Sequence, residues 1–284
     1  MEDKNVLVVQ GGGARGTYAA GALKVLLDNN FQFDDVYGTS AGALLGIEYL
    51  TKDADRMEKL ILELSSAKGF IKVQNYFTKG SIFDFDYLLN QLPKEKLPFR
   101  KEEFFNSKNN FYAVSANVDD NCVAYFSQKE PNFLAGLTSS ASLPPFSKPI
   151  MIDGKGYLDG GVFASVPFMK ALEEDARHIV VIATREKGYR KKAQNKAIKA
   201  LYRKGYRKNK PFLNSLLNSY KLYNEQMDLM DKLAEEGRIF VIYPSIPPKV
   251  KVTTQDKKML TELFDNAVND AKNSLTALSE YLSK

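Results

Sequence analysis

The sequence predicts an α/β fold with a mostly parallel central sheet. Two short apolar runs, Val6–Gln10 and Phe33–Tyr37, each lead into a turn that contains glycine and then into a segment with helical periodicity. Unbroken apolar runs of this length are typical of parallel strands that are buried on both faces. Strand, turn and helix repeated in this order indicate helices packed on both faces of the sheet. The 284 residues contain no internal repeat and no linker rich in proline, glycine or serine, so we expect one domain.

Helical periodicity recurs along the first half of the chain. The expected helices are Thr17–Asn29, Ala43–Tyr49, Asp53–Ala67 and Phe133–Ser142. In the first of these, Ala19, Leu23 and Leu26 are spaced to share one face. The last is expected to stop at the two prolines 144 and 145. Between them, Phe111–Val118 and Cys122–Ser127 are expected to form a hairpin.

The C-terminal third predicts two more strands and two long helices. The expected strands are His178–Thr184 and Ile239–Tyr243, and the expected helices are Phe212–Leu233 and Thr254–Leu282. In the last helix, apolar residues fall along one face, which predicts that it packs on the rest of the fold. The stretch Phe70–Phe99 is rich in aromatic residues without regular spacing. We interpret it as loop-rich chain whose aromatics pack in the core, rather than as a cap over the site.

The first element with chemical meaning is Gly11-Gly12-Gly13-Ala14-Arg15-Gly16, which follows a strand and precedes a helix. It matches the dinucleotide fingerprint, and Asp34 or Asp35 lies near the spacing of a ribose-binding acid. A dinucleotide-binding oxidoreductase is therefore one alternative. Backbone N–H groups of such a loop can equally converge on the oxyanion of an acyl transfer.

The second element is Gly38-Thr39-Ser40-Ala41-Gly42, between a predicted strand and a predicted helix. This pattern and setting are those of a nucleophile elbow, in which a sharp turn exposes the serine hydroxyl. The helix that follows directs its positive end toward the reacting oxygen. Ser40 is therefore the candidate nucleophile.

A catalytic triad would need a histidine, and the sequence contains only His178. It stands at the start of a predicted strand, whereas sites in parallel sheets form at the carboxyl ends of the strands. We therefore interpret His178 as a structural or surface residue. Replacing it with glutamine should leave hydrolysis within a few fold.

The third element, Tyr157-Leu158-Asp159-Gly160-Gly161, places a carboxylate before two glycines. The three elements in this order resemble the patatin-like phospholipase family over roughly residues 4–172, and Thr138–Pro144 resembles the family's segment before the aspartate. Gly161 departs from the commoner alanine. The remaining residues, 173–284, are expected to complete the same domain.

The resemblance implies a three-layer α/β fold and hydrolysis of lipid acyl esters by a Ser–Asp dyad, without a cofactor. It makes Ser40 the nucleophile and Asp159 the base, and burial would strengthen a carboxylate whose ordinary pKa is about 3.9. The implied oxyanion hole comprises amides of Gly11, Gly12, Gly13 and Ala41. Arg15 is expected to support the loop or to meet the acidic end of the substrate. The glycines that shape these motifs are Gly16, Gly38, Gly42, Gly160 and Gly161. A non-catalytic lipid-binding member of the fold is the second alternative.

Positive charge is concentrated in one segment. The net charge is +6, but residues 187–210 hold 11 lysines and arginines and no acid, so the rest of the chain carries −5. Ile198, Leu201 and Tyr202 fall at helical spacing, which suggests a basic amphipathic helix on anionic membranes; a solvated surface segment is the alternative. No nucleic-acid-binding module accompanies the charge. Replacing Lys191, Lys192, Arg203 and Lys204 with glutamine is expected to weaken vesicle binding and to spare hydrolysis of a soluble ester.

Other classes are not supported by the composition. Cys122 is the only cysteine, so no intrachain disulfide can form, and we expect it to be a small buried apolar residue. One histidine, one cysteine and no carboxylate cluster predict that no metal is bound. The sequence shows no signal-peptide pattern and no run of about 18 apolar residues, so we expect a protein that is kept in the cytoplasm or is exported by a route without an N-terminal signal.

Overall fold

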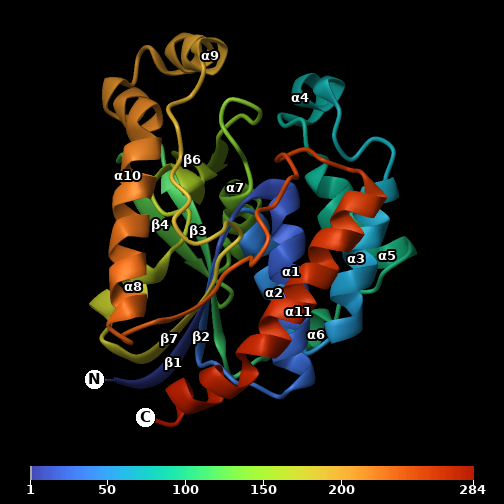
Figure 1. The fold of residues 1–284 in the computed structure, drawn as a ribbon. Coiled ribbons are helices and arrows are strands. Elements are labelled where there is room, and N and C mark those ends of the chain that lie inside the picture. The colour runs from blue at the N-terminus through green and yellow to red at the C-terminus, as the bar shows by residue number, and fades with distance from the viewer. Residues whose placement is uncertain (1) are drawn as a thin grey trace.

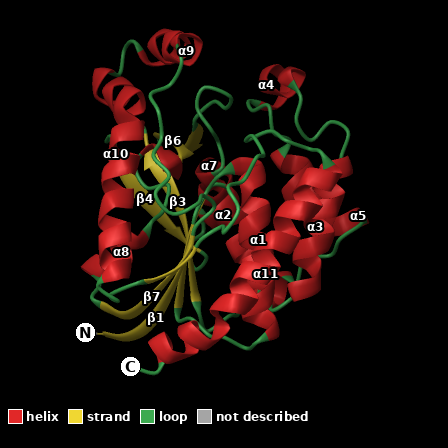
Figure 2. Cartoon of the chain, in the orientation of Figure 1, coloured by secondary structure: helices red, strands yellow, loops and turns green. Residues whose placement is uncertain are grey.

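The computed structural model describes residues 2–284 and places an eight-stranded sheet between two layers of helices (Figures 1 and 2). The strands are β1 Glu2–Val9, β2 Asp35–Thr39, β3 Asn110–Asn117, β4 Cys122–Ser127, β5 Ile150–Ile152, β6 Lys155–Asp159, β7 Ala176–Ile182 and β8 Phe240–Ile242. They run in the order β5-β6-β3-β2-β1-β7-β8, with β4 also paired to β3. The five strands from β3 to β8 are parallel, whereas β4, β5 and β6 pair antiparallel. The sheet is therefore mostly parallel, as predicted.

Helices cover both faces of the sheet. The α-helices are α1 Gly16–Asp28, α2 Ala41–Leu50, α3 Ala54–Ser66, α4 Val73–Lys79, α5 Leu92–Glu95, α6 Lys101–Phe105, α7 Phe133–Ser140, α8 Phe168–Glu173, α9 Lys196–Tyr206, α10 Lys210–Glu235 and α11 Lys257–Leu282. Short turns η1 Gly13–Arg15, η2 Tyr87–Gln91 and η3 Gly160–Val162 complete the elements. In Figure 1, α1, α2, α3 and α11 lie on one side of the sheet and α8 and α10 on the other.

The apolar run at the start of the chain is explained by burial on both faces. Leu7 and Val9 belong to the cluster beneath α1, α2, α3 and α11, whereas Val6 and Val8 belong to the cluster beneath α8 and α10. All four side chains are fully or almost fully buried. A strand that packs against helices on both sides has no polar face, which is why its sequence does not alternate.

The last helix packs along the first one. Helix α11 lies beside α1 in Figure 1, at the opposite end of the colour scale. Gly21 of α1 permits the contact, because a Cβ there would lie 2.6 Å from the carbonyl oxygen of Phe264 and 2.8 Å from the Cβ of Ala267. The apolar face predicted for this helix is the face that is buried.

Several expectations need correction. Cys122 is exposed at the start of β4 and is not a buried apolar residue. The stretch Phe70–Phe99 holds α4, η2 and α5 and so is less irregular than expected. The short hairpin of β5 and β6 and the helices α6 and α8 were not predicted, because three to six residues carry too little periodicity. Among residues 2–284, no helix combines the length and the hydropathy needed to span a membrane.

Candidate active site

The Ser40 turn has the backbone of a nucleophile elbow. Ser40 joins β2 to α2 with φ 58° and ψ −127°, a left-handed conformation that is unusual for serine. Glycine is required on both sides, because a Cβ at Gly42 would lie 2.3 Å from the carbonyl oxygen of Val9, and one at Gly38 would lie 2.6 Å from that of Gly42. The Ser40 amide donates to Oγ of Ser140 at 3.0 Å. The strained turn is therefore held from outside by a buried hydroxyl.

The pairing of strands in the sheet brings Asp159 next to Ser40. Strand β4 occupies one edge of β3 throughout, so β2 and β6 must share the other edge. On that edge β2 ends with Thr39 opposite Val114, and β6 ends with Asp159 opposite the next residue, Ser115. The two strands run in opposite directions and meet end to end. The nucleophile and the carboxylate are therefore neighbours although they lie far apart in the sequence.

The end of α7 and the residues that follow it hold both Ser40 and Asp159. Ser140 accepts from the Ser40 amide and donates to the carbonyl of Val114 at 2.6 Å. The Asp159 amide donates to the carbonyl of Ser142 at 2.9 Å. The sequence pointed to Thr138–Pro144 only through its resemblance. Its role in tying Ser40 and Asp159 to β3 is visible only in the structure.

Burial makes Asp159 a stronger base than an ordinary aspartate. The carboxyl is 3% exposed, and burial raises its pKa to about 6. A hydrogen bond from the Ser40 hydroxyl, a 2.7 Å hydrogen bond from the Gly161 amide and the positive charge of Lys191 each lower this pKa and so limit the rise. The Ser40 hydroxyl is therefore near enough to the carboxyl to affect its ionisation. At neutral pH the carboxylate is charged and can accept a proton.

The glycine loop lies against the elbow. The four amides that were expected to bind the oxyanion, three from the loop and one from the elbow, differ in whether they already have an acceptor. The Gly11 amide donates to the carbonyl of Ser165 at 3.1 Å, so it cannot also bind an oxyanion, which corrects its assignment. The amides of Gly12, Gly13 and Ala41 make no hydrogen bond to any of residues 2–284. Gly11 still matters for shape, because a Cβ there would lie 2.9 Å from the Cβ of Ser40.

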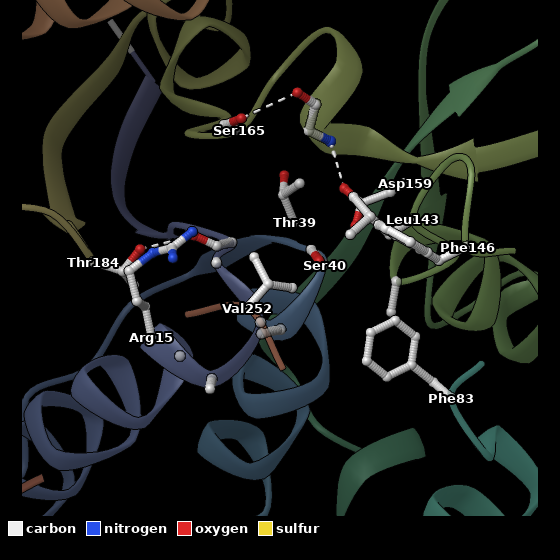
Figure 3. Close-up of a pocket in the computed structure, with 18 of the residues that line it drawn as sticks. Arg15, Thr39, Ser40, Phe83, Leu143, Phe146, Asp159, Ser165, Thr184 and Val252 are labelled. Atoms are coloured by element: carbon white, nitrogen blue, oxygen red, sulfur yellow. Dashed lines mark hydrogen bonds between the residues drawn. The ribbon is translucent and has the colours of Figure 1, made fainter. Parts of the chain in front are cut away.

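The remaining motif positions serve packing. A Cβ at Gly16 would lie 2.8 Å from the Cβ of Ala41, and one at Gly160 would lie 2.2 Å from the carbonyl oxygen of Val114. Gly161 donates its amide to Asp159 and its carbonyl accepts from Oγ of Ser165 at 3.1 Å (Figure 3). Ser165 in turn accepts from Nζ of Lys191 at 3.0 Å. Ser165 thus links the glycine loop, the Asp159 loop and Lys191.

Ser40, Asp159, the glycine loop, Ser165 and Lys191 line one cavity of about 450 Å³. In Figure 3, Ser40 lies between Arg15 on one side and Phe83, Leu143 and Phe146 on the other. Helices α2 and α3 add further apolar side chains to the wall. Phe70, Phe83, Phe85 and Leu88 also line the cavity, so the stretch that we interpreted as core packing contributes to the site as well as to the core. A volume of this size suits a lipid-sized ligand.

The basic segment also reaches the cavity. Lys191, Ile198 and Tyr202 line it, and Tyr202 is buried. The apolar face expected to meet a membrane is therefore turned largely inward, and of its three residues only Leu201 is exposed, at 47%. Lys191 cannot be counted among the surface cations, so the quadruple replacement predicted to spare hydrolysis would alter the site.

His178 and the candidate ribose-binding acids lie away from the cavity. His178 is buried on β7, with Nδ1 2.8 Å from Oδ1 of Asn5 and its ring 5.1 Å from that of Tyr281. Asp35 begins β2, at the end opposite Ser40, and is 3.6 Å from Lys4. Asp34 accepts from the Asn5 amide at the same end. A ribose-binding acid would be needed at the carboxyl end of β2, so the geometry does not support a dinucleotide site.

Metal ligands do not gather anywhere in residues 2–284: no group of three or more histidine, cysteine, aspartate or glutamate side chains is arranged to hold an ion.

A serine on an elbow beside a buried carboxylate and a glycine loop, in a three-layer α/β fold, defines the class of site. The sequence profile of the patatin-like phospholipases matches residues 7–172, more than half of the chain, and the chain belongs to that family. A second profile, a domain of unknown function named DUF6363, matches residues 209–283.

Two of the similar proteins match a longer part of this chain than the family profile does. The uncharacterized protein YjjU of Escherichia coli K12 is 27% identical over 248 residues, which cover 85% of this chain and 68% of YjjU. A putative patatin-like phospholipase domain-containing protein of Caenorhabditis elegans is 53% identical over 45 residues, 16% of this chain and 4% of its own. The crystal structure of VipD from Legionella pneumophila superposes with a TM-score of 0.50 at 13% identity, over 97% of this chain and 67% of VipD. The likeness to VipD concerns the fold.

Proposed function

We propose that this protein is a lipid acyl hydrolase that cleaves carboxylic esters through a covalent intermediate on Ser40. The observation that carries the proposal is that a hydroxyl on a strained elbow and a buried carboxyl, whose pKa is raised to about 6, stand at the adjoining ends of two strands. Membership of the patatin-like phospholipase family supports a lipid substrate. The alternative is a lipid-binding protein of the same fold without activity.

The proposed reaction has two halves, with Asp159 moving the proton in both. The Ser40 hydroxyl passes its proton to Asp159 while Oγ attacks the ester carbonyl carbon. Collapse of the tetrahedral intermediate breaks the ester bond, and the departing alcohol takes the proton from Asp159. Water then attacks the acyl group, again giving its proton to Asp159, and Ser40 leaves as the hydroxyl with release of the fatty acid.

The oxyanion is assigned to the amides of Gly12, Gly13 and Ala41. They are the loop and elbow donors without a protein acceptor, and Ala41 also starts helix α2, whose positive end favours negative charge. A preorganised donor of this kind is worth about 2.7–4 kcal/mol to the transition state. This contribution allows an Asp base to suffice without histidine.

The acyl chain is assigned to the apolar part of the cavity. Leu44 and Leu45 of α2, Leu60 and Ile61 of α3, and Phe83 line it near Ser40. Burying a methylene group contributes about 0.8 kcal/mol, so a chain of several carbons would be held by this wall alone.

We also propose peripheral contact with anionic membranes through residues 187–210. Helices α9 and α4 project from the same end of the molecule in Figure 1, and residues of α9 and residues just before α4 line the cavity. Helix α4 exposes Phe77 at 77% and Val73 at 69%. Exposed apolar side chains beside a cation-rich helix suit an anionic bilayer, which would then face the cavity.

The test is covalent labelling and hydrolysis. A fluorophosphonate should label wild-type protein and not Ser40→Ala, and both Ser40→Ala and Asp159→Asn should lose at least about a hundredfold in kcat on a short-chain ester, since general-base help is worth about 10²–10⁴-fold. Circular dichroism checks that the variants fold. If Asp159→Asn kept more than about a tenth of kcat, the assigned base would be wrong.

The matched control is His178→Gln, which changes a buried polar residue outside the cavity. It should remain labelled and keep kcat/KM within a few fold. A loss as large as that of Ser40→Ala, with the fold intact, would restore a histidine-dependent mechanism. Absence of labelling in the wild type would favour the non-catalytic alternative.

A further inference from the structure

Three cationic side chains line the cavity that holds Ser40 and Asp159. They are Arg15 of the glycine loop, and Arg185 and Lys191 after β7. Within residues 2–284, none of them lies within 4.0 Å of a carboxylate oxygen. Cations that are exposed at a surface need no partner, but these three are only partly accessible and face one another.

Their mutual repulsion is visible in their ionisation. Burial first, and then the charge of Arg185, lower the pKa of Arg15 to about 10. Burial first, and then the charges of Arg15 and Arg185, lower the pKa of Lys191 to about 8, against an opposing effect from Asp159. Glu186 acts in the opposite direction on Arg15, and its Oε2 is buried without a partner among the described residues. Two carboxylates, Asp159 and Glu186, are therefore set against three cations.

Arg15 has unused hydrogen-bonding capacity. Its Nε is buried and has no partner among the described residues. An unpaired buried donor costs about 1–3 kcal/mol, and more when the group is charged. A structural role would be expected to satisfy such a donor, so the free Nε indicates that the partner is a ligand.

Lys191 and Arg185 are held in place by neutral groups. Asn224 of α10 accepts from the Lys191 amide at 2.7 Å and donates to its carbonyl at 3.0 Å. The Lys191 ammonium lies 3.9 Å from the ring centre of Tyr223, and the Arg185 guanidinium lies 4.1 Å from that of Tyr189. The protein thus fixes the positions of the charges without neutralising them, which is the arrangement of a preorganised binding site.

The cations and the apolar wall lie on different sides of the nucleophile. Figure 3 places Arg15 on one side of Ser40 and Phe83 and Phe146 on the other. Nζ of Lys191 donates to Oγ of Ser165 at 3.0 Å, and Figure 3 places Ser165 away from Phe83 and Phe146, so Lys191 lies on the side away from the apolar wall. A ligand with an anionic head and an apolar tail would meet both sides, with its ester bond near Ser40.

We infer that Arg15, Arg185 and Lys191 form a subsite for the anionic oxyacid group, phosphate or carboxylate, of an amphiphilic substrate. The inference rests on the proposed function and narrows it: anionic lipid esters are preferred to neutral acylglycerols. Arginine forks suit the oxygens of such groups, and the low-dielectric surroundings strengthen the attraction. Arg185 and Lys191 lie beyond residues 7–172, the stretch that matches the family profile.

Binding is tested on Ser40→Ala, which cannot turn over, by calorimetry with three probes: n-octyl phosphate, n-octyl glucoside and inorganic phosphate. Octyl phosphate should bind at least about tenfold more tightly than octyl glucoside, a difference of about 1.4 kcal/mol. Adding Arg185→Gln and Lys191→Gln should reduce the preference to about twofold or less. Equal binding of the two octyl probes, or a preference that survives both changes, would overturn the subsite.

Control variants and a melting measurement separate the effect of these three cations on binding from the effects of net charge and of misfolding. Lys108→Gln with Lys272→Gln removes two exposed cations elsewhere and should leave the preference intact. Arg185→Lys keeps the charge and should keep most of it. The double variant of the subsite should melt close to its parent, because the relief of repulsion offsets the lost contacts with Ser165, Tyr189 and Tyr223. A large drop would mean that the cations are structural, and the inference would fall.

Inorganic phosphate distinguishes a site for free phosphate from a site for a lipid headgroup, and a hydrolysis assay distinguishes a bound substrate from a ligand that is not cleaved. If inorganic phosphate bound as tightly as octyl phosphate, the site would serve free phosphate and the lipid assignment would be wrong. On matched lauroyl esters, wild type should show a higher kcat/KM for lysophosphatidate than for monolaurin, and the subsite variant should lose about tenfold of that ratio. Phosphate-dependent binding without hydrolysis of either ester would support the subsite and reject the hydrolase.

Discussion

At the scale of single residues, Ser40 and Asp159 occupy states that neither would adopt in a free chain. Ser40 has a left-handed backbone, and Asp159 is removed from water. Each state costs free energy that the surrounding structure supplies: glycines at 38 and 42 admit the turn, Ser140 anchors its amide, and Gly161 donates to the carboxylate. Such conformations are typical of reactive sites.

The pKa values predict the pH dependence of hydrolysis. Asp159 works as a base only when deprotonated, so kcat/KM should rise as the pH passes through about 6. Lys191→Met should move this rise to higher pH, because the ammonium lowers the pKa of Asp159. The pH profile of kcat/KM on a soluble ester measures the shift; an unmoved profile would show that Lys191 does not act on the base.

The same shift has a consequence for stability. Because folding raises the pKa of Asp159 above its ordinary value of 3.8, its contribution to stability is present below about pH 4 and is lost as the pH rises through about 6. Asp159→Asn cannot ionise and should therefore melt higher than wild type at pH 8, but not at pH 4. Thermal unfolding at the two pH values checks this. Equal differences at both would show that ionisation of Asp159 is not the cause.

Ser140 predicts a further residue effect. Ser140→Ala leaves the Ser40 amide without its acceptor, which should cost about 1–3 kcal/mol of unfolding free energy and lower kcat. Ser139→Ala is the control, because Ser139 is also buried but bonds to Ser115 and to the carbonyl of Gly136. Denaturant titration and kcat should separate the two: Ser139→Ala loses stability without a matching loss of kcat. Equal losses of kcat would contradict the anchoring role.

At the scale of elements, helices α9 and α4 lie beside the cavity. Helix α9 turns Ile198 and Tyr202 inward and leaves its cations outward, and α4 exposes Phe77. The two helices project from the same end of the molecule in Figure 1, and residues of α9 and residues just before α4 line the cavity. We refer to α9 and α4 together as the rim of the cavity.

Membrane docking at this rim predicts a charge-dependent effect. Replacing Lys192, Lys196, Arg203 and Lys204 with glutamine should weaken binding to phosphatidylglycerol-containing vesicles by at least tenfold, since each cation contributes about 1 kcal/mol. Phe77→Ser should weaken it further. Activity on a soluble ester should change little, because none of these side chains lines the cavity.

The control replaces four exposed cations elsewhere: Lys59, Lys108, Lys257 and Lys272. Vesicle co-sedimentation at low and high salt is the measurement, because salt screens the attraction over about 8–10 Å. Binding that ignores salt, or equal loss in both quadruple variants, would show that α9 is only a solvated helix.

At the scale of the whole molecule, the C-terminal residues are built into the same body as the core. Strand β8 pairs with β7, α10 covers one face of the sheet and α11 packs on α1. We propose that residues 173–284 complete one domain with residues 4–172, although a separate profile matches 209–283. Lys191 and Tyr202 line the cavity, so the C-terminal part contributes to the site as well as to stability.

The α1–α11 contact predicts a stability effect. Gly21→Ala would place a methyl group 2.6 Å from the carbonyl oxygen of Phe264, forcing the helices apart at a cost of about 1–3 kcal/mol. Gly205→Ala in α9 is the control, because nothing lies within 4 Å of its Cβ, and alanine in a helix should stabilise by up to about 1 kcal/mol. Denaturant unfolding should show opposite signs. A stable Gly21→Ala variant would mean that α11 packs more loosely than described.

The sequence by itself determined the layout of the fold and the identity of the motif residues. Buried strands, long amphipathic helices and sharp glycine turns each leave a local pattern, and so the parallel core, α1, α10 and α11, and the Ser40 turn could be predicted. The order of the three motifs carried the candidate dyad. The family follows from the same residues.

Only the tertiary structure decided which groups meet. Asp159 reaches Ser40 because β2 and β6 share one edge of β3, a pairing that no local pattern encodes. Gly11 was misassigned because the acceptor of its amide, Ser165, lies on another loop. Lys191 was predicted to be a surface cation, because a charged residue in a basic segment is usually solvated. In the structure, contacts with Asn224 and Tyr223 of the distant helix α10 hold it in the cavity. Hydrophobic periodicity indicates which face of a single helix or strand is buried. It does not indicate which elements that face contacts, because those contacts depend on how the whole chain packs.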